Sequence, residues 1–402
     1  MSKIELIATA TFGLEAVVKR EIEDLGYRIL KSEDAKITYL ADERGIVRSN
    51  LWLRSADRVL VKMGEFEARI SEDLFQQTKA LPWEEWIPPD GKFTVNCTTV
   101  KSALRSEPAC QKTVKKAVVE RLSDYYMMDS FPETGAEYTI KVTILKDRAT
   151  LTIDTSGAGL HKRGYRVKNV AAPIKETLAA AMVQLSFWKP PRLLADPFCG
   201  SGTIAIEAAM RARNIAPGLG RDFASQRWEC IPQELWKQEK KLAYEAIDYE
   251  TELRIQASDI SGRALAAARE NAEEAGVEDC ISFSAKPFEK LRISEPHAVI
   301  LCNPPYGERI GEKSEMASVY AHLKQMLEQD GTLSAYVITA DKTLEQALLP
   351  RKPDRRRKLY NGRIETCFYQ YYGERPPKEE KPRQKEEKSY PAKEEKSQPS
   401  SS

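Results

Sequence analysis

The sequence LLADPFCGSGT, residues 193–203, decides the fold class of this 402-residue chain. Its first four residues predict a buried strand, and the segment from Thr203 to about residue 212 predicts a helix. The turn between them places Gly200 and Gly202 where a ligand can lie close against the backbone. A strand, a glycine-rich turn and a helix in this order are typical of a doubly wound α/β domain. Because Ala205 stands where a dinucleotide fingerprint has its third glycine, the turn alone does not separate a nicotinamide cofactor from S-adenosylmethionine.

Strands and helices continue to alternate after this turn. The apolar patterns predict strands at 254–258, 281–285, 298–302 and 334–339, and helices at 262–275 and 316–328. Residues 357–359 and 365–372 are predicted as a final strand pair, because Asn361-Gly362 is a strong hairpin signal. We therefore expect a parallel sheet that is closed by an antiparallel hairpin. Residues 213–253 do not fit the alternation, and we expect them to form an insertion with a charged helix from Pro232.

The sequence AVILCNPPY, residues 298–306, ends one of these strands abruptly. Asn303, Pro304, Pro305 and Tyr306 are therefore expected at the carboxyl edge of the sheet, where ligands bind in such folds. An amide oxygen and a freed backbone carbonyl can accept the hydrogens of an exocyclic amine and stabilise the charge that develops as it attacks a methyl group. The tyrosine ring can stack on the target base, which contributes about 1–3 kcal/mol. The tetrapeptide alone fits a simple strand end and turn equally well.

Two other strand ends offer contacts to a cofactor. Asp259 ends the second strand, and a carboxylate at that position suits the two hydroxyls of a ribose. Lys286-Pro287-Phe288 ends the third strand, where an adenine ring could be covered. Cys199 and Cys302 flank the expected site. We expect both to be small buried fillers, because direct transfer to an amine needs no thiol nucleophile.

The first half of the chain predicts two smaller α+β units. Strands at 4–8, 27–30, 36–40 and 58–65, with helices at 14–25 and 43–54, give the β-α-β-β-α-β order of a ferredoxin-like unit. The second unit has helices from 71 to about 80 and at 114–122, and strands at 93–100, 138–145 and 149–154. Lys146-Asp147 separates the last two strands, which predicts a hairpin. The first unit carries no catalytic constellation, so we expect it to be scaffold.

Basic residues of the second unit and of the segment after it point to nucleic acid. A cationic helix face beside strands suits phosphate groups, although a charged helix face is more often only solvated. Glycines mark residues 157–168 as a linker, and its interleaved cations and tyrosine could grip a nucleic-acid strand. The candidate RNA contacts are Lys101, Arg105, Lys112, Lys115 and Lys116 in the second unit, and His161, Lys162, Arg163, Tyr165 and Arg166 in the linker.

Composition limits the remaining classes of function. The net charge is +2, so any nucleic-acid surface must be local. Seven scattered cysteines without a CxxC pair, and only three histidines, argue against a zinc module or a disulfide framework, and we expect no metal. We expect a cytoplasmic protein, because the first residues lack the apolar core of a signal peptide and no apolar stretch could span a bilayer. Residues 374–402 are rich in Lys, Glu, Pro, Ser and Gln, which predicts a disordered tail.

Together these motifs resemble a known family. Residues 196–203 (DPFCGSGT), Asp259 and residues 303–306 (NPPY) are similar to the motifs of class I S-adenosylmethionine-dependent methyltransferases that act on exocyclic amines. The upstream half resembles a ferredoxin-like domain followed by a THUMP domain. Residues 160–166 (LHKRGYR) and 172–177 (APIKET) resemble the join in THUMP-containing RNA guanine-N2-methyltransferases. The most similar group makes N2-methylguanosine in bacterial large-subunit ribosomal RNA. This chain departs from the family after the third strand, where Lys286-Pro287-Phe288 stands in place of the usual acidic residue.

The resemblance implies an α/β fold, with a Rossmann-like seven-stranded methyltransferase domain preceded by ferredoxin-like and THUMP domains. The implied boundaries are 1–65 for the ferredoxin-like unit, 66–156 for the THUMP unit (beginning near 45 in the broader sense), 157–190 for the linker and first helix, 191–373 for the methyltransferase domain and 374–402 for the tail. Asn303 and the Pro304 carbonyl would hold the guanine N2 amine, and Tyr306 would stack on the base. The implied contacts to S-adenosyl-L-methionine are Asp196, Phe198, Gly200, Ser201, Gly202, Thr203, Asp259, Ile260, Lys175 and Glu176.

Several alternatives remain open. The same chemistry could act on a guanosine of transfer RNA, on adenine N6 in nucleic acid or on a glutamine amide, since asparagine-proline-proline-aromatic corners suit each of these amines. A dehydrogenase could use the glycine turn, but it would give residues 303–306 no task. A non-catalytic RNA-binding or ribosome-assembly factor would tolerate the loss of Asn303. The paired α+β units favour RNA, and 23S ribosomal RNA is the substrate that the resemblance favours.

Overall fold

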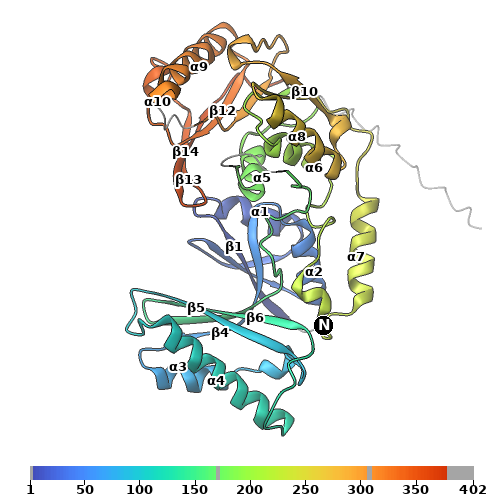
Figure 1. Cartoon of the computed structure of the whole chain (residues 1–402), viewed down its shortest axis with the longest axis vertical. Coiled ribbons are helices and arrows are strands. Elements are labelled where there is room, and N and C mark those ends of the chain that lie inside the picture. The colour runs from blue at the N-terminus through green and yellow to red at the C-terminus, as the bar shows by residue number, and fades with distance from the viewer. Residues whose placement is uncertain (1–2, 169–172, 306–309, 378–402) are drawn as a thin grey trace, which may run out of the picture.

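The computed structural model describes residues 3–168, 173–305 and 310–377, with side chains from Met316 onward in the last range. Two seven-stranded sheets and their helices make up this part of the chain. Figure 1 shows the sheet of the first half below and that of the second half above it. Tyr306 and the predicted tail beyond residue 377 lie outside the described residues. No described helix is both long and apolar enough to cross a membrane.

The first sheet runs without a break through both N-terminal units, in the order β2-β3-β1-β4-β7-β6-β5. Residues 56–61 of β4 pair with β1, and residues 60–67 pair with β7. The two units therefore share one long strand, and the predicted boundary between residues 65 and 66 falls inside it. The strands are β1 (Ile4–Ala10), β2 (Arg28–Glu33), β3 (Lys36–Ala41), β4 (Ala56–Glu67), β5 (Lys92–Val100), β6 (Glu137–Leu145) and β7 (Arg148–Asp154).

Helices pack against this sheet and share its apolar core. They are α1 (Glu15–Asp24), α2 (Glu43–Trp52), α3 (Ser71–Lys79) and α4 (Glu107–Tyr126), with the 3-10 turn η1 (Trp83–Glu85). The Asp42 side chain caps α2 by accepting a hydrogen bond from the Gly45 N–H at 2.8 Å. The predicted helix at 114–122 is too short, because Ser106 caps α4 and Pro108 lies in its first turn.

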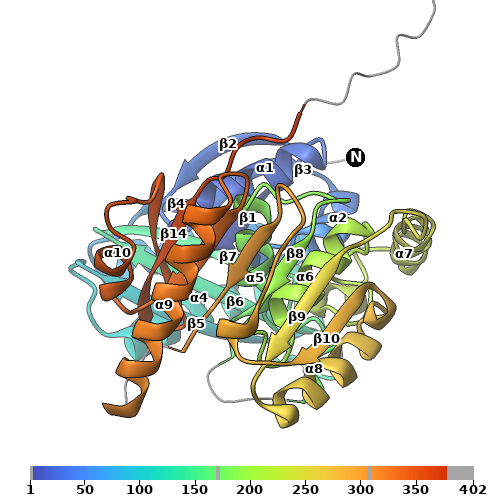
Figure 2. The same cartoon turned by 90° about the horizontal axis from the view of Figure 1, so that it is seen from above.

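The second sheet has the order β10-β9-β8-β11-β12-β14-β13. Pairs from β10 to β12 are parallel, and β14 is antiparallel to both of its neighbours, which confirms the predicted design. Its strands are β8 (Leu194–Asp196), β9 (Ile255–Asp259), β10 (Ile281–Ala285), β11 (Val299–Cys302), β12 (Ser334–Thr339), β13 (Arg355–Asn361) and β14 (Ile364–Tyr371). Its helices are α5 (Glu176–Leu185), α6 (Thr203–Ala212), α8 (Gly262–Glu274), α9 (Ile310–Gln329) and α10 (Thr343–Ala347), with the turns η3 (Glu278–Cys280) and η4 (Phe288–Lys290). Figure 2 shows β8, β9 and β10 side by side from above.

The predicted insertion at 213–253 packs on the N-terminal half rather than standing apart. It contains the turn η2 (Ala224–Arg227) and the helix α7 (Gln233–Glu245), which lies beside the lower half of the molecule in Figure 1. Trp228 is 1% exposed and stacks on Tyr138 of β6 with ring centroids 4.8 Å apart. Arg44 of α2 forms an ion pair with the buried Glu239 of α7 at 3.1 Å. The insertion therefore joins the two halves through a shared core.

Candidate functional site

Three neighbouring strands bring the predicted cofactor and target residues to one edge of the second sheet. β8 pairs in parallel with β11, with Leu194 opposite Val299. It also pairs with β9, with Asp196 opposite Ala257. Because the carboxyl ends of parallel strands meet at one edge, Asp196, Asn303 and Asp259 emerge beside one another.

The glycine turn after β8 is held in place by the end of β9. Gly200 and Gly202 have φ angles of 51° and 84°, which glycine adopts without the steric cost of a side chain. The Gly200 N–H donates a hydrogen bond to the Asp259 carboxylate at 3.0 Å, and the Gly202 N–H donates to the Cys199 carbonyl at 2.7 Å. Asp259 therefore orders the turn as well as standing where the sequence predicts a ribose contact.

Asp196 is a buried carboxylate without a hydrogen-bond partner. It is 1% exposed, and no described group within hydrogen-bond geometry reaches either of its side-chain oxygens. Burial raises the pKa of Asp196 to about 8, and the Asp259 carboxylate adds to this while the nearby Phe198 N–H acts in the opposite direction. An unpaired acceptor under the glycine turn is expensive unless a ligand donates to it.

Asn303 presents a second unpaired acceptor at the same edge. Its side-chain Oδ1 is buried and has no hydrogen-bond partner among the described residues. Pro304 is buried and Pro305 is exposed. Cys199 and Cys302 are 6% and 3% exposed, and burial raises the pKa of both thiols well above its ordinary value. The expectation that they are buried fillers is confirmed, because a thiol that stays protonated is a poor nucleophile.

Aromatic and apolar side chains lie beside the site. Phe198 stacks on Phe288 with centroids 5.3 Å apart, and Phe288 also meets the edge of His322. The side chain of Ile260 is 76% exposed directly after Asp259. Phe288 follows β10, where the sequence predicts a cover for a planar ring, but its side chain is 4% exposed and packs in the apolar core. The contact of His322 with Phe288 was not predicted, because His322 lies on α9, far from the motifs in sequence.

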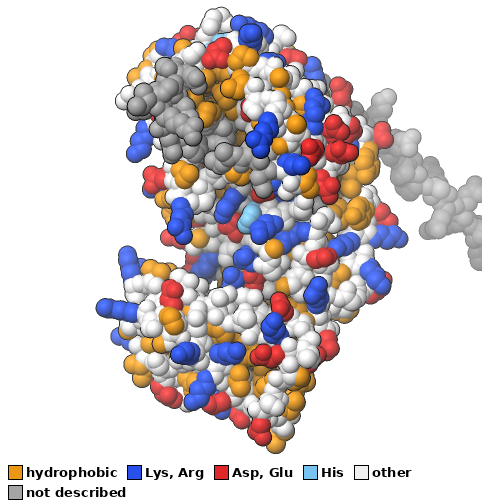
Figure 3. All heavy atoms as spheres, in the orientation of Figure 1, with side chains coloured by type: hydrophobic (Ala, Val, Ile, Leu, Met, Phe, Trp, Pro, Cys, Tyr) orange, Lys and Arg blue, Asp and Glu red, His pale blue; other side chains and the backbone are white. Residues whose placement is uncertain are grey.

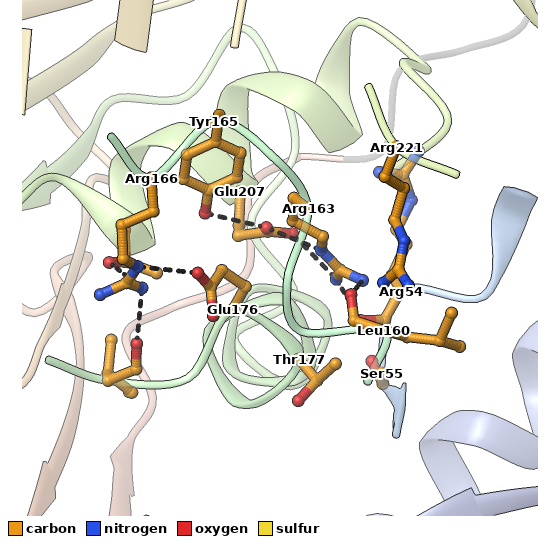
Figure 4. A network of polar contacts seen from close by, with 12 residues as sticks. Arg54, Ser55, Leu160, Arg163, Tyr165, Arg166, Glu176, Thr177, Glu207 and Arg221 are labelled. Atoms are coloured by element: carbon orange, nitrogen blue, oxygen red, sulfur yellow. Dashed lines mark hydrogen bonds and ion pairs between the residues drawn. The ribbon is translucent and has the colours of Figure 1, made fainter. Parts of the chain in front are cut away.

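Arg163 and Tyr165 do not face solvent, so their predicted RNA contacts are wrong. Both are 4% exposed and point at Glu207 of α6, as Figure 4 shows. The Arg163 guanidinium donates to Glu207 at 3.2 Å and to the Leu160 carbonyl at 2.8 Å, and the Tyr165 hydroxyl donates to Glu207 at 3.1 Å. A buried carboxylate such as Glu207 requires a cationic or hydrogen-bonding partner, and Arg163 of the linker is that partner.

Arg166 is also largely taken up inside the protein. Its guanidinium donates to Glu176 at 2.7 Å, to the Ile174 carbonyl at 2.9 Å and to the Thr203 hydroxyl at 3.0 Å. Its Nη1 is buried and unpaired. Glu176, predicted as a cofactor contact, is therefore a partner of Arg166. Together the two residues connect the linker and α5 to the first residue of α6, directly after the glycine turn.

The remaining predicted RNA contacts are accessible. Lys162 is exposed and His161 is half-buried, and both line a cavity of about 410 Å³ together with Lys175. Lys101 and Arg105 line a second cavity of about 480 Å³ after β5. Lys112, Lys115 and Lys116 are exposed on α4, where Lys115 lies over the Phe93 ring and Lys116 over the Phe75 ring.

Family models match three consecutive parts of the chain. A ferredoxin-like domain described for RlmL matches residues 5–60, a THUMP domain matches 68–154 and an RMKL-like methyltransferase domain matches 163–370. The three models follow the order of the two sheets. They also confirm the domain types that the motifs imply, and they begin the methyltransferase match inside the linker.

Relatives match the chain almost from end to end. The Bacillus subtilis (strain 168) protein named "Putative RNA methyltransferase YpsC" is 48% identical over 95% of this chain and 99% of its own length. A "predicted N6-adenine-specific DNA methylase" from Listeria monocytogenes str. 4b F2365 is 44% identical, with a TM-score of 0.88, and covers 93% of this chain and 97% of its own. The structure titled "Crystal structure of SMU.472, a putative methyltransferase complexed with SAH" is 40% identical with a TM-score of 0.88, covering 94% of this chain and all of its own.

The described residues fit the cofactor that these matches imply. The unpaired Asp196 side chain provides an acceptor for a polar ligand at the start of α6, and the positive φ angles of Gly200 and Gly202 shape the turn beside it. Asp259 keeps lone pairs free beside its bonds to the Gly200 and Ser261 N–H groups, so it can still accept from a ribose. By its family models and its relatives, the chain belongs to the THUMP-containing RMKL-like methyltransferases and is an S-adenosylmethionine-dependent RNA methyltransferase.

Proposed function

We propose that the enzyme methylates the exocyclic N2 amine of a guanosine, and that the guanosine lies in 23S ribosomal RNA. The observation that supports the chemistry is the buried, unpaired Oδ1 of Asn303 at the edge that it shares with Asp196. An acceptor without a partner is well placed to bind an amine hydrogen. Such a bond recovers the cost of burying the amide oxygen.

The exocyclic amine is a weak nucleophile, because its lone pair is delocalised into the guanine ring. S-adenosylmethionine supplies the electrophilic methyl group. Asn303 Oδ1 and the Pro304 carbonyl accept hydrogen bonds from the two amine hydrogens. These bonds orient the nitrogen and stabilise the positive charge that develops on it. Tyr306, outside the described residues, is proposed to stack on the base.

The cofactor contacts follow the strand ends. We assign the methionine side to Asp196, Ser201 and Thr203 around the glycine turn, and the ribose to Asp259. Phe198 and Ile260 offer surface for the adenine side. Lys175 stands at the start of α5 and stays a proposed contact, whereas Glu176 acts through Arg166, whose guanidinium it binds at 2.7 Å.

RNA is proposed to contact the exposed cations of both halves. Lys101, Arg105, Lys112, Lys115 and Lys116 present charge on the THUMP unit, and Lys162 presents charge on the linker. We retain the boundaries 1–65, 66–156, 157–190, 191–373 and 374–402 as proposals for the domains. A cytoplasmic site of action fits an enzyme of ribosomal RNA.

Adenine N6 is the second candidate, because the Listeria relative is named for that amine and because the Asn303 corner can hold it equally well. A transfer RNA guanosine keeps the chemistry and changes only the RNA. A glutamine amide is the third amine that fits the corner. The THUMP match at residues 68–154 supports RNA over DNA and protein.

Nucleoside analysis tests the proposal. Ribosomal and transfer RNA from a strain without the gene are digested separately and compared with RNA from the parent strain. Loss of one N2-methylguanosine from 23S ribosomal RNA, restored by the wild-type gene, is the expected result. Unchanged N2-methylguanosine together with loss of N6-methyladenosine would favour the second candidate. Loss of N2-methylguanosine from transfer RNA alone would identify transfer RNA as the substrate.

A further inference from the structure

A cavity of about 410 Å³ lies where the linker meets the start of α5. Residues 161–164, Arg166 and residues 173–176 line it. Figure 3 shows lysine and arginine side chains gathered around the hollowed waist between the upper and lower parts of the molecule. The cavity is therefore a concave site in a cationic region, a setting that suits an anionic ligand.

Some cationic side chains that line the cavity are paired with a carboxylate, and others are not. Arg166 is paired with Glu176 at 2.7 Å, so their charges cancel. The side chains of Lys162 and Lys175 form no hydrogen bond or ion pair with another described residue. The cavity therefore holds two positive charges that nothing in the described chain compensates by direct contact.

His161 responds to this excess of positive charge. Burial lowers the pKa of His161 to about 4, and Lys175, Lys162 and Arg163 add to the effect against the opposing Asp57 carboxylate. The imidazole is therefore neutral near pH 7, and it can donate one hydrogen bond without adding a charge. Asp57 is itself engaged with the hydroxyls of Thr11 and Thr177.

The walls of the cavity are fixed before any ligand arrives. Arg166 holds the Ile174 carbonyl at 2.9 Å, which ties the two lining segments together. Gly164 has a φ of 109°, and a Cβ added there would lie 2.5 Å from the Gly220 carbonyl oxygen. A preorganised site loses less free energy to ordering when it binds.

The cavity adjoins the cofactor turn. The same Arg166 guanidinium that lines it donates to the Thr203 hydroxyl at 3.0 Å, and Thr203 is the first residue of α6. An anionic group in the cavity that belongs to the substrate must be linked covalently to the base held by Asn303. In RNA, the group that meets this condition is a backbone phosphate.

We propose that this cavity binds a backbone phosphate of the RNA strand that carries the target nucleotide. Lys162 and Lys175 supply the charge, and His161 supplies a hydrogen bond. The proposal rests on the RNA substrate proposed above and specifies where the strand is held. It requires neither a guanine target nor a particular RNA.

The test uses the full chain with the double change Lys162→Ala and Lys175→Ala. Binding of a fluorescent mixed-sequence single-stranded oligoribonucleotide is measured between 50 and 200 mM salt. Loss of one phosphate contact should reduce the slope of log K against log salt by about 0.7. The control is Lys189→Ala with Lys352→Ala. These two exposed lysines precede β8 and β13, so they lie at the opposite edge of the sheet, and the control removes the same charge.

The thermal midpoint should stay at the wild-type value in both double variants, and the single variant Lys162→Ala should keep the wild-type affinity for S-adenosylmethionine. A salt slope equal to that of the control overturns the proposal, and so does a loss of cofactor affinity in Lys162→Ala, which would assign the cavity to the cofactor. Binding is measured without methylation, so the outcome does not depend on which amine is methylated. If the methylated base proved not to be guanine, the cavity variant would still show the reduced slope of log K against log salt.

Discussion

Arg163 of the linker donates to Glu207 of α6 across 3.2 Å, with the two side chains only 2% and 0% exposed. Arg163 also donates to the carbonyl of Arg54, which lies two residues before β4 in the N-terminal half. One guanidinium therefore joins the RNA-binding half to the helix that begins at the cofactor turn. Burial of both charges makes this junction sensitive to the loss of either partner.

Replacing Glu207 by leucine should destabilise the protein by about 3–5 kcal/mol, because it leaves the Arg163 charge buried without its partner. Urea denaturation measures the change. The matched control is the double variant Arg163→Met with Glu207→Leu, which removes both charges and should recover part of the loss. A single variant as stable as the wild type would contradict a buried ion pair at this junction.

The contribution of Asp196 to the stability of the protein should fall as pH rises from about 4 to about 8. Its folded-state pKa of about 8 lies above the unfolded value, so the native state holds a proton that the unfolded state has released. Asp196→Asn keeps the group neutral and should flatten this fall, by an amount on the order of a few kcal/mol. Thermal midpoints from pH 5 to pH 9 measure it. Asp129→Asn, at an exposed position, should leave the profile unchanged.

His161 should act at the acidic end of the profile and with the opposite sign. Its folded-state pKa of about 4 lies below the unfolded value of about 6.5, so the unfolded state binds a proton first as pH falls. Stability is therefore lost between about pH 6.5 and pH 4, and His161→Gln should reduce that loss. Thermal midpoints across this window test the expectation. Parallel profiles for wild type and variant would show that His161 titrates normally in the folded chain.

Asn303→Ala should lower kcat by about 10²–10³-fold, the cost of losing one preorganised polar contact to a developing charge. Affinity for S-adenosylmethionine should stay near the wild-type value, because the amide serves the target amine. Single-turnover methylation and calorimetric titration measure the two quantities. Gln346→Ala on α10 removes an exposed amide and serves as the control. Equal losses of cofactor affinity and rate would place Asn303 on the cofactor instead.

Local patterns predicted most of the strands of the second sheet. The bounds of β10 and β12 agree with the sequence prediction, because each is a short run of strand-forming residues between clear turn signals. The Asn361-Gly362 and Lys146-Asp147 turns are also present between the expected strands, with positive φ at Gly362, Lys146 and Asp147. These features depend on neighbours in sequence.

Features that depend on distant partners escaped the sequence analysis. Arg163 and Tyr165 were assigned to RNA, because a cation and an aromatic ring beside glycines look accessible, and their partner Glu207 lies more than 40 positions away. The sequence predicted an insertion but not where it packs, because no local pattern shows that Trp228 stacks on Tyr138. Burial in a shared core can be recognised only when the positions of both contacting segments in the fold are known.

The long strand β4 gives the N-terminal half a mechanical property. Because it pairs with β1 at one end and with β7 at the other, the ferredoxin-like and THUMP units cannot hinge against each other without breaking main-chain hydrogen bonds. The ferredoxin-like and THUMP units should move as one rigid body, which fixes the distance between the THUMP surface and the methylated base. An RNA would then be selected by the length and bend of the segment between the nucleotides that the THUMP unit binds and the target nucleotide.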